Sequence, residues 1–390
     1  MTTFQERYAK LNTAQKQAVE TIDGPLMVVA GPGTGKTELL SMRTANILKK
    51  TDTLPDNILC LTFTESGANA MRERLTKIIG ADAYKVAIHT FHSFGTEVIN
   101  QYRKFFYSGA DFRPADELSS YGILRTILDE LPFNNPLTSK MNGEYTHLSE
   151  IITTISELKR SSLTSDELLK ILDSNDETLD RFEPAITNIF DKRVTKDTVK
   201  ELEPLSLEIA EHRGYALPSN FFLLANTIAI SLAHAIDDAA STDSTKPITA
   251  WKNKWTEKNE HGKIVFKDRK RHEKLRALSY VYLQYLNRMQ EAALYDFDDM
   301  VLRVVHAIEV FPELRYTLQE KYLYIMVDEF QDTNFAQARI LTSLTALETG
   351  DAPNIMVVGD DDQAIYSFQG AEVRNIMHFR EQFEGAELVV

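Results

Sequence analysis

The sequence predicts an α/β fold: a parallel sheet interrupted by a large, mostly α-helical insertion. Short apolar runs rich in β-branched residues occur near both ends of the 390-residue chain, each next to a helical pattern. A glycine-rich turn joins the first of these runs to its helix. Between residues 101 and 295 the apolar residues recur instead at the spacing of amphipathic helices, which predicts the insertion.

The predicted strands form two groups. Residues 25–30, 57–63 and 85–89 make the first group, and residues 322–328 and 354–359 make the second, with a helix over residues 335–347 between the last two strands. An alternation of strands and helices is typical of parallel pairing, and the five strands are compatible with one sheet.

The middle of the chain is predicted to be helical. Apolar spacing predicts helices over residues 147–160 and 273–294, and Thr164 and Glu167 have the spacing of a capping box that opens a further helix. Residues 237–244, rich in Asp, Ser and Ala, are expected to form a flexible loop.

Composition excludes several classes of protein. With 43 Lys+Arg against 57 Asp+Glu the formal net charge is -14, which excludes a globally basic nucleic-acid binder but not a local basic face. The only cysteine is Cys60, so an intramolecular disulfide and a multi-cysteine zinc or iron–sulfur site are excluded. The sequence shows neither a signal-peptide core nor an apolar run of membrane-spanning length, so we expect a soluble, cytoplasmic protein with no membrane partner.

The first chemical signal is the glycine-rich turn after the predicted strand 25–30. Its glycines allow backbone N–H groups and the following helix N-terminus to surround a phosphate chain, with Lys36 reaching the β- and γ-phosphates and Thr37 as a ligand of Mg²⁺. The strict phosphate-loop pattern begins with glycine, where this chain has Ala30; the alternative is a strand-to-helix turn without a ligand. The turn consists of Ala30, Gly31, Pro32, Gly33, Thr34, Gly35, Lys36 and Thr37.

The second signal is a pair of acids, Asp328 and Glu329, at the end of the predicted strand 322–328. Ligands of parallel sheets bind at the carboxyl ends of strands, so Asp328 is expected to hold the metal and Glu329 to orient or deprotonate an attacking water. Adjacent acids at a strand end are also common on protein surfaces. Together with the phosphate loop, however, they favour nucleotide hydrolysis.

Several further segments carry a family resemblance. The chain resembles the UvrD/Rep/PcrA family of superfamily 1 DNA helicases, which implies a RecA-like P-loop NTPase domain using ATP and Mg²⁺. The segments that carry this resemblance, in chain order, are LNTAQ at 11–15, LTFT at 61–64, ANAMRER at 68–74, IHTFHSF at 88–94, YDFDDM at 295–300, VDEFQDT at 327–333 and VGDDDQAIYSFQGA at 358–371.

The resemblance also implies roles for individual residues. Gln15 would recognise adenine, Gln363 would sense the γ-phosphate, and Tyr366 and Phe368 would stack on bases, while segments 61–64 and 88–94 would touch single-stranded DNA. The chain departs from the family where Glu38 stands in place of a frequent arginine, and where Gln369 follows Phe368 in place of Trp-Arg.

Nucleic-acid contacts are expected at two places. Aromatic rings that bind bases and the polar residues beside them are expected just after predicted strand ends, although each ring is equally well explained as core packing. Residues 251–276 hold ten basic and four acidic residues, an excess of six positive charges that is predicted to grip duplex or a single-strand/duplex junction, unless it is only a solvated face. The predicted DNA-binding residues are Phe63, Thr64, Phe91, His92, Tyr366, Phe368, Lys267, Lys270 and Arg271.

These inferences give one overall expectation. Residues 1–100 and 296–390 are expected to form two segments of a RecA-like ATPase domain, and residues 101–295 a helical insertion domain, with a second RecA-like domain absent from a chain that is the N-terminal part of a longer helicase. By resemblance that helicase would move 3′ to 5′ on single-stranded DNA and unwind duplex in repair, replication or recombination. Two other classes remain open: the motor subunit of a recombination helicase–nuclease, and a nucleotide-regulated DNA-binding scaffold without unwinding.

Overall fold

The structure is a computed structural model that describes residues 4–31, 33–106, 112–212, 224–348, 350, 352–360, 379, 383 and 386–389. The chain forms two compact units. Unit 1 comprises Met1–Asp116, Thr153–Ser162 and Gln290–Val390, and unit 2 comprises Glu117–Ile152 and Leu163–Met289. The assignment of domains made from the sequence used other boundaries and stays a prediction.

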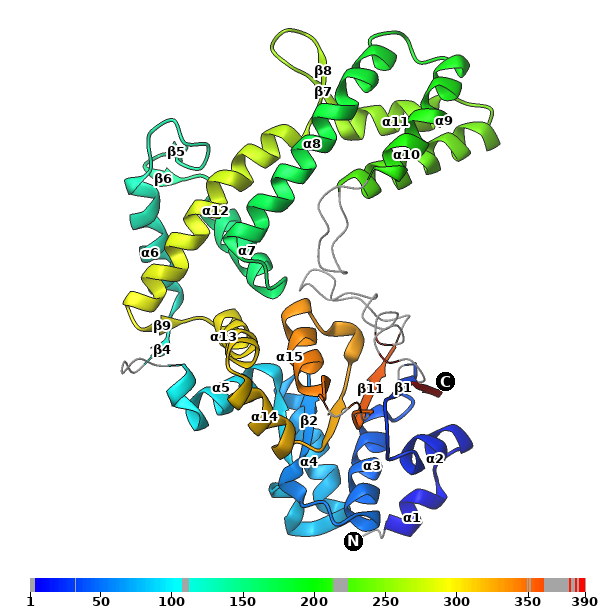
Figure 1. The fold of residues 1–390 in the computed structure, drawn as a ribbon, viewed down its shortest axis with the longest axis vertical. Coiled ribbons are helices and arrows are strands. Elements are labelled where there is room, and N and C mark those ends of the chain that lie inside the picture. The colour runs from blue at the N-terminus through cyan, green and yellow to red at the C-terminus, as the bar shows by residue number, and fades with distance from the viewer. Residues whose placement is uncertain are drawn as a thin grey trace. The chain divides into compact units, whose positions relative to one another are not determined.

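Unit 1 is built around a six-stranded parallel sheet with the strand order β12-β1-β11-β10-β2-β3. All five predicted strands lie in this sheet, so the predicted α/β fold is confirmed. N-terminal elements, blue to cyan in Figure 1, and C-terminal elements, orange to red, contribute to the same sheet. The strands are β1 (Leu26–Val29), β2 (Ile58–Thr62), β3 (Ala87–Thr90), β10 (Tyr324–Val327), β11 (Ile355–Gly359) and β12 (Glu387–Val389).

Helices cover both faces of this sheet. Alternate strand residues point to opposite faces, so Met27 packs in one apolar cluster while Leu26 and Val28 pack in the other. The first cluster includes residues of α5 (Phe91–Gln101), α13 (Phe297–Val310), α14 (Pro312–Lys321) and α15 (Phe335–Thr345). The second includes residues of α2 (Thr13–Glu20), α3 (Lys36–Lys50) and α4 (Glu65–Ile79), and α1 (Phe4–Ala9) packs on α3.

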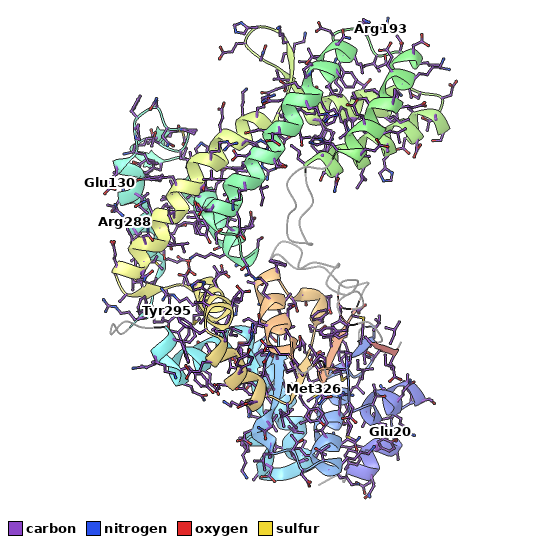
Figure 2. All side chains as sticks on the ribbon, in the orientation of Figure 1. Glu20, Glu130, Arg193, Arg288, Tyr295 and Met326 are labelled. Atoms are coloured by element: carbon purple, nitrogen blue, oxygen red, sulfur yellow. The ribbon has the colours of Figure 1, made fainter. Side chains whose placement is uncertain are left out.

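Unit 2 is mostly helical. One apolar cluster of unit 2 is formed by the second half of α8 with α9, α10, α11 and the β7–β8 hairpin. Arg288 on α12 pairs with Glu130 on α6, and both residues are labelled in Figure 2. The elements are α6 (Glu117–Glu130), β5 (Lys140–Met141), β6 (Glu144–Tyr145), α7 (Leu148–Arg160), α8 (Ser165–Phe190), α9 (Lys196–Glu211), α10 (Leu224–Ser241), α11 (Lys246–Trp255), β7 (Thr256–Lys258), β8 (Ile264–Phe266) and α12 (Asp268–Glu291); α7 and α12 run on into unit 1.

Most helix predictions are confirmed, including the capping box in which Thr164 accepts from the backbone of Glu167 at the start of α8. The expected flexible loop over residues 237–244 is wrong for its first five residues, because α10 continues to Ser241. Alanines keep the helical propensity of this segment high, and Ala239 is buried against the rest of unit 2. Within the described residues, no helix is both long and apolar enough to cross a membrane.

Candidate nucleotide site and nucleic-acid interface

The phosphate loop lies between β1 and α3, at the carboxyl edge of the sheet. Gly33 and Gly35 have φ values of 74° and 85°, a left-handed conformation that favours glycine, and Gly35 is the N-cap of α3. The Thr34 hydroxyl donates to the Gly31 carbonyl at 2.8 Å, and the Ala30 N–H donates to the Gly359 carbonyl of β11 at 2.9 Å. These bonds fix the loop to its own turn and to the neighbouring strand; Pro32 lies outside the described residues.

Lys36 is the first residue of α3, and its ammonium group is the clearest sign of an anion site. Lys36 Nζ lies 3.0 Å from Glu329 Oε2, yet it is buried and makes no hydrogen bond of acceptable geometry within the described part of the chain. A buried ammonium with unused donors carries a desolvation cost that a bound phosphate would remove. The left-handed glycines, the helix N-terminus and this lysine therefore fit a phosphate chain.

The predicted acids follow β10, which is separated from β1 by β11 alone. Asp328 is buried, and this burial together with the neighbouring Glu329 carboxylate raises the pKa of Asp328 to about 6. The same two causes raise the pKa of Asp332 to about 6. Negative charge in this part of the site is thus poorly compensated without a ligand, as expected of carboxylates that bind a divalent cation.

Glu329 stands out for its backbone as well as its position. Its φ of 51° and ψ of 48° are left-handed, a conformation that is costly for a residue with a side chain and that occurs often at functional sites. Gln331 Nε2 donates to Glu329 Oε2 at 2.8 Å, and Gln331 Oε1 accepts from the Asp360 N–H at 3.0 Å. Gln331 therefore connects the loops after β10 and β11. Sequence reasoning placed Gln331 in a motif but gave it no role.

A magnesium ion would have few protein ligands here. Among the described residues, no group of three or more His, Cys, Asp or Glu side chains is arranged to hold a metal ion. That arrangement is compatible with Mg²⁺, which is usually bound through one or two protein groups together with phosphate oxygens and water. The Thr37 hydroxyl, in the first turn of α3, and the Asp328 carboxylate are the side chains that would hold it.

Gln15 lies next to the phosphate loop. Its Nε2 donates to the Thr34 carbonyl at 2.9 Å, and its Oε1 accepts from the Asn12 N–H at 3.0 Å in a capping box at the start of α2. Both ends of the amide are used inside the protein. Recognition of adenine by Gln15 would require one of these bonds to be exchanged and stays a prediction.

The expected DNA-contact residues after β2 and β3 differ in exposure. Phe63 is partly exposed, and Thr64 is exposed and caps α4 through its side chain. Phe91 is only 2% exposed and packs in the core between the sheet and α13, which contradicts its predicted stacking role, because a buried ring has no face for a base. Its neighbour His92 is partly buried against Phe297 with the rings 6.0 Å apart, and burial lowers the pKa of His92.

Phe297 is an exposed aromatic that sequence reasoning missed. It is the first residue of α13 and is 71% exposed. A large ring left in solvent beside His92, near the ends of the strands, has the form of a stacking surface. The signal was present in the segment YDFDDM at 295–300. Gln363, Tyr366 and Phe368 lie outside the described residues.

The acids of the same segment have a structural role. Lys159, at the end of α7, is fully buried with Nζ 2.5 Å from Asp296 Oδ2 and 2.7 Å from Asp299 Oδ1. Arg160 Nε lies 3.1 Å from Asp298 Oδ1, and burial raises the pKa of Asp299. We call Lys159, Asp296 and Asp299 the buried triad; it fastens the last turn of α7 to the first turn of α13.

The basic stretch of unit 2 is largely built into the fold. Arg269 pairs with Asp180 and Glu183 on α8, and Arg276 pairs with Asp173 and Asp176 on the same helix. The three predicted contact residues of this stretch all remain exposed; they are Lys267, Lys270 and Arg271. Lys267 Nζ donates to the Asn253 carbonyl at 2.5 Å, Lys270 pairs with Glu257 at 2.7 Å, and Arg271 has no ion pair within the described part of unit 2.

A parallel sheet with a glycine-rich loop after β1, a lysine opening the next helix and an acid directly after β10 defines a P-loop nucleotide-binding domain of the RecA-like type. The protein-family model described as the UvrD/REP helicase N-terminal domain matches residues 11–384, and the chain belongs to this family. The resemblance noted in the sequence is thereby confirmed.

Curated relatives match almost the whole chain. It is 27% identical over 379 residues to the ATP-dependent DNA helicase PcrA of Staphylococcus aureus strain Mu50, with 97% of this chain and 37% of the relative covered. It is 28% identical over 382 residues to DNA helicase II of Rickettsia typhi, with 97% and 41% covered. It is 26% identical over 384 residues to PcrA of Bacillus subtilis, with 97% and 36% covered. The chain therefore spans about two fifths of the length of the curated relatives that it matches.

Proposed function

We propose that this chain carries the nucleotide-binding site of an ATP-dependent DNA helicase, which couples ATP hydrolysis to movement on single-stranded DNA and to unwinding of duplex. The buried Lys36 ammonium, at the N-terminus of α3 and 3.0 Å from Glu329 Oε2, is the observation that carries the proposal. Membership of the UvrD/REP family and the printed names of the relatives support it.

The residues of the site divide the work of phosphoryl transfer. The loop N–H groups and Lys36 bind the β- and γ-phosphates and stabilise the charge that develops on them. Mg²⁺, held by Thr37 and Asp328, would neutralise phosphate charge. Glu329 leaves Lys36 when the nucleotide arrives and then orients the attacking water and accepts its proton. Gln15 reads the base, and Gln363 senses the γ-phosphate, as the family resemblance implies.

The single strand would pass along the carboxyl edge of the sheet. Phe63 supplies a partly exposed ring and Phe297 an exposed one, and Thr64 and His92 supply hydrogen-bonding groups beside them. Tyr366 and Phe368 are proposed to stack on bases from the resemblance alone. In unit 2, Lys267, Lys270 and Arg271 are proposed to contact duplex phosphates, since exposed ion pairs such as Lys270–Glu257 are weak and exchange readily with other anions.

Direction, pathway and wider assembly belong to the same proposal. Movement from 3′ to 5′ and a place in repair, replication or recombination follow the family resemblance. The motor subunit of a helicase–nuclease would carry the same nucleotide site, so it is an alternative that the site does not distinguish. A nucleotide-regulated DNA-binding scaffold would carry the same nucleotide site as well. Lys36→Ala separates it from a motor, because a scaffold should keep its DNA-binding function and a motor should lose unwinding.

Substitution of Lys36 tests the proposal. Wild-type and Lys36→Ala proteins are compared for binding of a fluorescent ATP analogue with Mg²⁺, for ATP hydrolysis with and without single-stranded DNA, and for unwinding of a duplex with a 3′ single-stranded tail. Lys36→Ala is expected to weaken nucleotide binding by about a hundredfold or more, because a phosphate-bound ammonium in a buried site contributes about 3 kcal/mol. Lys85→Ala, at an exposed residue of unit 1, is the matched control. Equal nucleotide affinity in the wild type and Lys36→Ala would refute the proposal.

A further inference from the structure

Glu38 places a negative charge beside the phosphate loop. It lies in the first turn of α3, two residues after Lys36. A Cβ added to Gly35 would lie 3.9 Å from Glu38 Cβ and 3.9 Å from Gln15 Nε2, so the end of the loop, Gln15 and Glu38 meet at one place. An acid here suits the N-terminus of the isolated helix, but it opposes a polyanion bound at that same N-terminus.

Arg7 supplies the opposite charge from a different element. Arg7 Nη1 donates to Glu38 Oε1 at 2.7 Å, and the two side chains are only 17% and 27% exposed. Partial burial reduces screening by solvent, so each charge acts more strongly on its surroundings than a surface charge would. Arg7 Nε is also buried and has no acceptor within the described residues.

The helix that carries Arg7 is joined to α3 by apolar as well as charged contacts. α1 has six residues, none of which is fully buried, and it packs on α3. Phe4 and Tyr8 pack against the apolar cluster that includes residues of α3, and the Arg7–Glu38 pair adds a charged link to the helix that opens at the phosphate loop. With α1 docked by these apolar contacts, the main electrostatic effect of Arg7 is to balance the charge of Glu38 beside the loop.

We propose that Arg7 is a positioning residue of the nucleotide site: it neutralises Glu38 so that the loop and Lys36 accept a nucleoside triphosphate. This inference rests on the proposed function. Arg7 acts through Glu38 and not through direct contact with the ligand. The contribution of Arg7 to ligand affinity consequently grows with the negative charge of the ligand and disappears when Glu38 is neutral.

The test compares four proteins: wild type, Arg7→Ala, Glu38→Gln, and the double variant with both changes. Affinity for the fluorescent ATP analogue mant-ATP is measured with Mg²⁺, and adenosine is measured by competition. Arg7→Ala is expected to bind mant-ATP about tenfold more weakly, while its affinity for adenosine changes by less than about twofold. The double variant is expected to return to within about threefold of the wild type, because no charge is left uncompensated.

Two results would overturn the inference. One is an Arg7→Ala protein that binds mant-ATP as well as the wild type does. The other is a double variant that stays as weak as Arg7→Ala, which would assign Arg7 a direct contact or a purely structural role. Thermal melting of all four proteins shows whether α1 is lost, and rescue by Glu38→Gln distinguishes lost charge balance from lost structure.

Two further proteins separate this inference from the proposed function. Lys104→Ala breaks an exposed ion pair with Glu313 elsewhere in unit 1 and should leave affinity unchanged. Lys36→Ala reports on the site itself. If wild type and Lys36→Ala bind mant-ATP equally, the proposed function fails; if Lys36→Ala loses binding but Arg7→Ala does not, only the role of Arg7 fails.

Discussion

Removing Lys159 from the buried triad should strongly destabilise unit 1. Lys159 is fully buried, and its Nζ lies 2.5 Å and 2.7 Å from two carboxylates. In Lys159→Met the apolar part of the side chain is retained, but Asp296 and Asp299 face each other without a cation. Breaking a buried ion pair from one side typically costs about 3–5 kcal/mol.

The assay is thermal unfolding of wild type and Lys159→Met. In a domain of 150–250 residues each kcal/mol shifts the melting temperature by about 2–4 °C, so a shift of roughly 10 °C is expected. Burial already raises the pKa of Asp299, and losing Lys159 raises it further. A carboxyl with a raised folded-state pKa binds more protons folded than unfolded, so Lys159→Met gains stability as the pH falls toward 4. The difference from wild type should therefore be smaller at pH 5 than at pH 8.

A matched rescue makes this prediction refutable. Adding Asp296→Asn and Asp299→Asn to Lys159→Met removes both unpaired charges, and asparagine keeps the N-cap that Asp296 provides to α13. This triple variant should recover most of the lost stability. Lys200→Met, at an exposed lysine of α9, should melt as wild type does. A triple variant no more stable than Lys159→Met would show that the ion pairs are not the source of the effect.

The remaining predictions concern the site and the DNA surface. Burial raises the pKa of the Asp328 carboxyl from 3.8 to about 6, so its charge destabilises the ligand-free protein. Asp328→Asn should therefore stabilise the protein in EDTA by up to about 3 kcal/mol while weakening Mg²⁺-nucleotide binding. A lower melting temperature of Asp328→Asn in EDTA would contradict this. Since that folded-state pKa is raised, ligand-free wild type gains stability from Asp328 as the pH falls from above 6 toward 4, and Asp328→Asn should lack this gain. His92 has a pKa lowered by burial, so it contributes a loss of stability as the pH falls through 6.5, and His92→Gln should lose less stability than wild type between pH 7 and pH 5. Reversing the charges of Lys267, Lys270 and Arg271 together should weaken DNA binding and flatten the dependence of DNA affinity on salt concentration. Reversing three lysines near α9 (Lys192, Lys196 and Lys200) should change neither quantity. An equal salt dependence in the two variants would exclude the proposed surface.

Local patterns made much of the fold predictable. Four of the five predicted strands are short apolar runs buried almost throughout, and such runs are specified by their own residues and by the turns that bound them; the fifth, β3, lies at the sheet edge and is buried on one face. The phosphate loop was predictable for the same reason, since Gly33 and Gly35 are needed for the local backbone.

Roles that depend on orientation or on distant partners were not predictable. Phe91 and His92 follow the same strand, but the helix that begins there turns Phe91 into the core and His92 toward Phe297. The positive excess over residues 251–276 overstated the free charge, because the acids that pair with Arg269 and Arg276 lie on α8, far away in sequence. The pairing of Lys159 with Asp296 and Asp299 was not predictable either, because these carboxylates are also far from Lys159 in sequence.

The ligand-free contact between Lys36 and Glu329 has a consequence for how fast and how selectively the site fills. The lysine ammonium is already buried and lies next to the Glu329 carboxylate before any nucleotide arrives. Ordering a free lysine costs up to about 2 kcal/mol of side-chain entropy, and here that cost falls on folding, not on binding. An incoming phosphate has to replace the Glu329 carboxylate at Lys36. Weakly charged anions therefore bind poorly, and a ligand with several phosphate oxygens gains binding free energy from the exchange.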